Sequence, residues 1–113
     1  GNSYVTTLHT IVSGVIKLSR VWSIPPSRKV YRGISGLRLP PAFWVQDAHG
    51  CCGGVELGLM STTTKREVAT HYSMSKEEGR HATLIEIEVG QIDRGASLMW
   101  LSQYPGGEEE VLL

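Results

Sequence analysis

Three consecutive glutamates, Glu108, Glu109 and Glu110, stand directly before the apolar end of the chain. That apolar run predicts the start of a buried strand over residues 109–113. Because alternate side chains of a strand share a face, Glu108 and Glu110 are expected to point the same way and Glu109 the opposite way. Two carboxylates side by side repel each other and lower stability. Such a pair indicates chemistry that needs both groups, and therefore an active site.

Two other polar stretches are expected at strand ends. One is Tyr31-Arg32-Gly33, and the other is Ser61-Thr62-Thr63. Their order and spacing relative to the glutamates resemble the arginine-specific mono-ADP-ribosyltransferases of the cholera-toxin-like superfamily, whose signature is Arg, Ser-Thr-Ser and Glu-x-Glu. Thr63 stands where that signature has its final serine, which keeps the hydroxyl. The resemblance spans nearly the whole chain and is carried by all three motifs in family order.

The resemblance implies both a fold and a reaction. The fold is α+β, with two small mixed or antiparallel β-sheets packed together, helices alongside, and NAD in the cleft between the sheets. The reaction transfers ADP-ribose from NAD to a side chain and releases nicotinamide. The pyridinium leaving group departs neutral and needs no general acid, whereas the ribose becomes oxocarbenium-like, as in glycoside cleavage. A fixed carboxylate would stabilise that cation.

The resemblance also assigns four catalytic roles. Glu110 would bond a ribose hydroxyl and stabilise the cation. Glu108 would hold and deprotonate the guanidinium of the acceptor, which is protonated at neutral pH and a poor nucleophile until a base removes a proton. Arg32 would bind the NAD phosphate and ribose through its planar donor fork. Ser61 would bond the nicotinamide ribose and help to orient Glu110.

Further positions are assigned to binding by the same resemblance. Gly33 would let the backbone approach the nicotinamide amide closely. Tyr31, Thr62 and Thr63 complete the cofactor-binding set, with the two threonines supporting their turn. Tyr104, in the turn before the glutamates, would orient the acceptor arginine.

The elements that position these residues follow from pattern. Apolar residues at three- and four-residue spacing predict a helix over residues 4–21 that packs one stripe on the domain. Thr64 and Glu67 have the spacing of a capping box and predict a second helix through Tyr72. Strict alternation predicts a strand over residues 82–89. Shorter strands are expected over residues 28–34, 55–60 (running into the Ser-Thr stretch), 97–100 and 109–113, with an irregular connection over residues 39–54.

Composition limits the remaining choices. The 113 residues make one domain, here 1–113, and both ends look truncated. Basic and acidic residues balance at 11 each, which gives no support to a nucleic-acid or membrane partner. His49, Cys51 and Cys52 fit no zinc spacing, so no metal is expected, and two adjacent cysteines mildly favour a cytoplasmic setting.

The sequence thus predicts an enzyme that uses NAD as co-substrate and modifies a protein arginine or a small guanidino compound, with NADP left open as the donor. Two alternatives remain. One is an NAD glycohydrolase, in which water replaces the guanidine. The other is a catalytically inactive module of the same fold that binds NAD or a protein.

Overall fold

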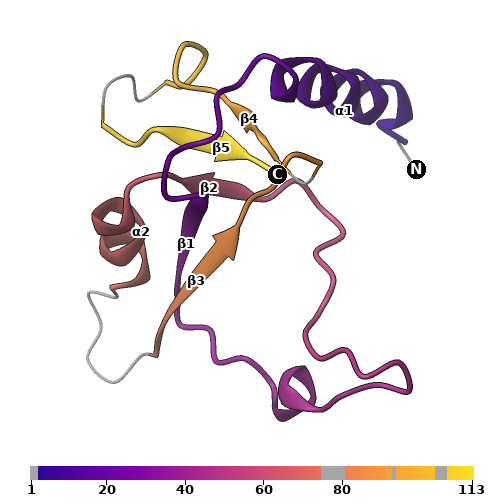
Figure 1. Ribbon diagram of the computed structural model, residues 1–113, viewed down its shortest axis with the longest axis vertical. Coiled ribbons are helices and arrows are strands. Elements are labelled where there is room, and N and C mark those ends of the chain that lie inside the picture. The colour runs from indigo at the N-terminus through magenta and orange to yellow at the C-terminus, as the bar shows by residue number, and fades with distance from the viewer. Residues whose placement is uncertain (1–2, 75–80, 93, 104–106) are drawn as a thin grey trace.

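The computed structural model describes residues 3–74, 81–92, 94–103 and 107–113 (Figure 1). These residues form a mixed α+β structure, the class expected from the sequence. Neither helix in the described ranges has the length and apolar character that a membrane span requires. The elements in chain order are α1 (Val5–Ser19), β1 (Lys29–Ser35), the 3₁₀ helix η1 (Pro41–Trp44), β2 (Ser61–Thr63), α2 (Arg66–Ser73), β3 (Ala82–Glu88), β4 (Ala96–Ser97) and β5 (Glu110–Leu112).

The described strands form one antiparallel sheet in the order β3-β1-β2-β5-β4. Seven residue pairs join β1 to β3, whereas Tyr31↔Thr63 is the single registered pair between β1 and β2. The resemblance implies two packed sheets, and the described residues instead place both groups of strands in one sheet. Its two parts, β3-β1 and β2-β5-β4, meet at this pair. The arginine strand and the glutamate strand therefore lie one on each side of β2.

The core is small and lies where the two parts of the sheet meet. Val30 of β1, Val111 of β5 and Val89 just after β3 are at most 3% exposed. Four partly buried side chains pack around them: Trp22, Ile24, Ile87 and Leu113. Val30 stands two residues before Arg32 on the same strand face, and Val111 directly follows Glu110. Burial of these two valines therefore holds the strands that carry the candidate catalytic residues.

Helix α2 lies close against β1 at Gly33. A Cβ atom built on Gly33 would stand 1.6 Å from the backbone oxygen of Ala69 and 2.8 Å from the backbone nitrogen of Ser73. No side chain fits in that space, so only glycine permits this approach of helix backbone to strand backbone. Ala69 and Ser73 are both buried by the contact.

Helix α1 forms as predicted, with slightly shorter bounds, but its apolar stripe is largely exposed. Leu8 is 54% exposed and Ile16 49%, and α1 has no buried residue. The expectation that the stripe packs on the domain is therefore wrong for most of its length. The helix meets the two-residue strand β4 at the end of the sheet, and so short a strand offers little surface to cover (Figure 1).

Residues 55–60 do not form the predicted strand. Val55 and Leu57 are exposed, and within the described residues only Met60 makes ladder-like bonds, exchanging both backbone hydrogen bonds with Leu113. An apolar run becomes a strand only when a neighbouring strand accepts its backbone groups. In Figure 1 the connection between β1 and β2 extends away from the sheet and returns to it at β2. Apart from η1, the irregular connection predicted over residues 39–54 is confirmed and extends to β2.

Two smaller expectations also need correction. The strand predicted over residues 97–100 is reduced to β4, because Leu101 and Ser102 both donate backbone bonds to the Leu98 carbonyl and form a turn. Helix α2 has Lys65 at its N-cap, without a side-chain cap. The predicted capping box does not form, since the Thr64 hydroxyl donates to the Glu109 carboxylate instead.

Candidate active site

The predicted residues gather around one pocket of about 420 Å³, a volume within the range of small-molecule sites. Arg32 comes from β1, Ser61 from β2, Glu110 from the first position of β5, and Glu108 from the turn two residues before it. Helix α2 supplies one wall. The remaining lining residues are Tyr31, Gly33, Ile34, Ser35, Thr62, Thr63, Val68, Ala69 and Tyr72.

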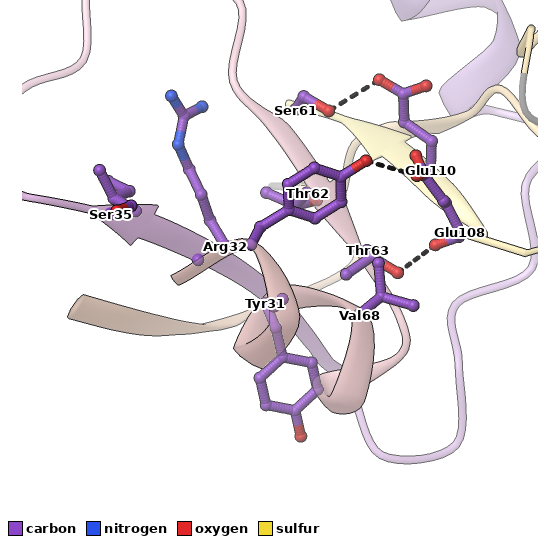
Figure 2. A pocket seen from close by; sticks show the side chains of 13 residues that line it. Tyr31, Arg32, Ser35, Ser61, Thr62, Thr63, Val68, Glu108 and Glu110 are labelled. Atoms are coloured by element: carbon purple, nitrogen blue, oxygen red, sulfur yellow. Dashed lines mark hydrogen bonds between the residues drawn. The ribbon is translucent and has the colours of Figure 1, made fainter. Parts of the chain in front are cut away.

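Ser61 and Glu110 point toward each other across the β2–β5 ladder (Figure 2). Ser61 pairs with Leu112 and Thr63 with Glu110, so Ser61 and Glu110 are diagonal neighbours on one face. The Ser61 hydroxyl donates a 2.7 Å hydrogen bond to Glu110 Oε1. This hydrogen bond restricts the orientation of the Glu110 carboxylate, and the catalytic role that the resemblance gives to Ser61 stays a prediction. Ser61 itself is exposed, so the pair is open to a ligand.

Thr62 and Thr63 are buried, at 4% and 6% exposure, and hold the glutamate-bearing segment in place. The Thr62 hydroxyl donates to the Val111 carbonyl at 2.7 Å, and the Thr63 hydroxyl donates to the Glu108 carbonyl. Both side chains thus bond the backbone of the partner segment. A contact of either with a cofactor stays a prediction.

The three glutamates separate as expected, but strand alternation is not the cause, because only Glu110 belongs to β5. Glu108 and Glu110 line the pocket, whereas Glu109 forms a 3.2 Å ion pair with Lys65 and accepts a hydrogen bond from Thr64. These two partners, the Thr64 bond first, hold the pKa of Glu109 below its usual 4.5. Glu109 also has a φ of +45°, which is uncommon for a residue other than glycine. This turn of the backbone precedes the regular ladder of β5.

Arg32 is half-buried. In Figure 2 its side chain extends from β1 on the side where Ser61 lies, and the ring of Tyr31 points in the opposite direction. The ion pairs of the described residues are Lys29–Glu86 and Lys65–Glu109, and neither uses Arg32. A guanidinium beside a pocket and outside these pairs is suited to bind a phosphate. Gly33 is required for the approach of α2, a structural reason that the sequence did not reveal.

The sequence reasoning missed Tyr72 on α2. Its hydroxyl donates a hydrogen bond to Glu108 Oε1. Each carboxylate of the pair thus accepts a hydroxyl bond from a different element, Glu108 from α2 and Glu110 from β2. The predicted second helix ended at Tyr72, but no pattern in the chain shows which side chain of that helix reaches the glutamates. Tyr104, predicted to orient the acceptor, lies outside the described residues.

The remaining candidate ligands are not gathered into a site. Cys51 and Cys52 are exposed free thiols in the connection between β1 and β2. Within the described ranges, no three His, Cys, Asp or Glu side chains are placed to hold a metal ion. The Asp47 carboxylate accepts backbone bonds from His49 and Cys51, which shapes the turn around the thiols.

No protein-family model, curated protein or solved structure matches the chain. The features of this chain that bear on function are therefore the pocket residues, their geometry and the signature that they match.

Proposed function

We propose that this chain transfers ADP-ribose from NAD to the guanidinium of an arginine, with release of nicotinamide. The observation that carries the proposal is the single pocket that gathers Arg32, Ser61, Glu108 and Glu110, with Ser61 hydrogen-bonded to Glu110. These are the side chains of the Arg, Ser-Thr-Ser and Glu-x-Glu signature, and they come from β1, β2, β5 and the turn that precedes β5. The fold proposed is the ADP-ribosyltransferase-like one, with NAD where the two parts of the sheet meet.

The reaction follows from the position of Glu110. The bond between ribose C1′ and the nicotinamide nitrogen breaks, and its electron pair neutralises the pyridinium. The ribose is left as an oxocarbenium-like cation, which a fixed carboxylate stabilises. In this proposal Glu110, held by Ser61 at 2.7 Å, supplies that negative charge.

Capture of the cation needs a deprotonated acceptor. A guanidinium nitrogen bonds to C1′ as it loses a proton, and the proposed base is Glu108, on the same side of the pocket as Glu110. The products are ADP-ribosylarginine, nicotinamide and one proton. NAD itself would be held by Arg32 at its phosphates, with Tyr31, Gly33, Ser61, Thr62 and Thr63 as the rest of its binding set.

NAD hydrolysis is the second candidate function. Ser61 is exposed and the pocket opens to solvent beside Glu110, so water can reach the cation. Both reactions use Glu110, whereas only transfer to guanidine uses Glu108 as a base.

The test is incubation of the chain with NAD and agmatine, measuring free nicotinamide, agmatine adduct and free ADP-ribose. Glu110→Gln is expected to lower nicotinamide release by about 100-fold or more, because the cation loses its counter-charge. Glu108→Gln is expected to lower adduct formation by about 100-fold, the usual contribution of a positioned base, while hydrolysis changes little.

Glu109→Gln is the matched control, since it makes the same chemical change at the glutamate that faces Lys65. It should retain both activities. A chain that releases no nicotinamide with either acceptor would overturn the proposed function. Equal losses of transfer and hydrolysis in Glu108→Gln would overturn the division of roles between the two carboxylates.

A further inference from the structure

Tyr72 is a pocket residue outside the signature, and it contacts Glu108, the proposed acceptor-side base. It lies near the end of α2, is 53% exposed, and lines the pocket beside Val68 and Ala69. Its hydroxyl donates to Glu108 Oε1, one of the hydrogen bonds among the pocket side chains drawn in Figure 2.

The helix turn that carries Tyr72 is held in place by backbone packing on β1. One residue along the helix, Ser73 is buried, and its backbone nitrogen lies over Gly33. Ala69, three residues before Tyr72, is buried against the same glycine. The last turn of α2 is therefore fixed on β1, and a tyrosine on that turn is presented to the pocket at a defined place.

The hydrogen bond has a chemical consequence for Glu108. A carboxylate that accepts a hydrogen bond at one oxygen is restricted in its rotation, and a hydrogen bond to a charged group is stronger than one between neutral groups. Oε1 accepts the hydrogen bond from the phenol hydroxyl, so Oε2 is the oxygen left to accept a bond from a guanidinium. An aromatic ring beside that oxygen also offers a face on which a planar guanidinium can stack.

We propose that Tyr72 is the positioning residue for Glu108 and thereby decides whether the ribose cation is captured by a guanidinium or by water. This inference depends on the proposed function and adds its acceptor-side determinant. The residue acts through Glu108 and the acceptor. It has no role in breaking the bond to nicotinamide.

The experiment compares the full chain with Tyr72→Phe, which removes the hydroxyl, and Tyr72→Leu, which also removes the ring. The readout is the ratio of agmatine adduct to free ADP-ribose, measured together with total nicotinamide. Tyr72→Phe is expected to lower that ratio about tenfold, the factor that about 1.4 kcal/mol represents, while nicotinamide release changes less than about twofold. The KM for agmatine should rise in Tyr72→Leu while the KM for NAD stays constant.

Two controls separate positioning from folding. Tyr4→Phe makes the same change at a tyrosine that is 66% exposed and precedes α1, and it should leave the ratio unchanged. In the Glu108→Gln background, Tyr72→Phe should produce no further fall in the ratio, because the two residues act as one unit. If Tyr72→Phe acted only by disturbing the fold, it would lower the ratio further in the Glu108→Gln background.

The outcomes are distinguishable. An unchanged ratio in Tyr72→Phe, with activity intact, overturns this inference and leaves the proposed function standing. A fall in nicotinamide release equal to the fall in adduct also overturns it, because Tyr72 would then act on bond cleavage. An unmodified chain that releases no nicotinamide overturns the proposed function and this inference together.

Discussion

The two helices differ in how their sequence pattern relates to their packing. Helix α1 has a regular apolar stripe, yet no residue in it is buried. Helix α2 is shorter and more polar, yet it buries Ala69 and Ser73 and forms a wall of the pocket. The difference comes from what each helix meets, a two-residue strand for α1 and the glycine-bearing face of the seven-residue β1 for α2. A clean periodicity predicts that a helix forms, and its burial depends on a surface of matching size.

The two helices should differ most in how stability responds to a glycine-to-alanine change. The two positions are Gly33, on which α2 packs, and Gly14, inside α1. Gly33→Ala places a Cβ 1.6 Å from the Ala69 oxygen, so α2 must move away from β1. We expect a loss of about 1–3 kcal/mol in the free energy of unfolding, the usual range for overpacking, and weaker NAD cleavage. Urea unfolding followed by circular dichroism, and nicotinamide release, check this.

Gly14→Ala in α1 is the paired change and should have the opposite sign. A Cβ at Gly14 meets nothing within 4 Å, and alanine in a helix interior is favoured over glycine by about 0.5–1 kcal/mol. Destabilisation by both substitutions would show that α1 packs more closely than described. Stabilisation by both would show that α2 is not held at Gly33.

A smaller effect on the free energy of unfolding is expected from Glu109→Gln. This change removes the ion pair between Glu109 and Lys65, the N-cap residue of α2. Thr64 and Lys65 lower the pKa of Glu109 in the folded chain. A carboxyl whose pKa is lower in the folded chain than in the unfolded chain adds stability at pH values above its unfolded-state pKa. That contribution is lost as the pH falls through its folded-state pKa. Wild type should therefore exceed Glu109→Gln in stability at neutral pH, by less than about 1 kcal/mol because the pair is partly exposed.

The measurement is urea unfolding of both proteins between neutral and acid pH. The difference in unfolding free energy should shrink only below pH 4.5, the ordinary value for this carboxyl. A difference that is constant from neutral pH to well below that value would contradict the assignment to Glu109. Glu86→Gln, which removes the partner of Lys29 on β3, is a control outside the glutamate segment.

The smallest effect is expected in the apolar stripe of α1. Leu8→Ala should change the free energy of unfolding by no more than about 0.5 kcal/mol, because Leu8 is already half exposed in the folded chain. Val30→Ala, at a fully buried position in β1, should cost about 2 kcal/mol and serves as the reference. Equal losses in Leu8→Ala and Val30→Ala would mean that the apolar stripe of α1 is buried in solution.

Much of the element pattern could be read from the chain. Alternation located β3, apolar spacing located α1, and the segment that follows the Ser-Thr stretch was correctly assigned as a helix. The strand predicted over residues 55–60 failed because an apolar run does not specify a neighbouring strand to bond with. The capping box failed because Glu109, 45 residues away in sequence, receives the Thr64 hydroxyl.

In the candidate site, too, some features were predictable from local sequence and others depend on contacts between distant segments. The types and order of Arg32, Ser61, Glu108 and Glu110 were evident from spacing, since side-chain alternation and motif order are local properties of a chain. Their convergence on one pocket, the approach of α2 at Gly33 and the bond from Tyr72 to Glu108 arise from contacts between segments distant in sequence. Local pattern specifies which groups a chain can present. The packing of backbone against backbone specifies which of them meet.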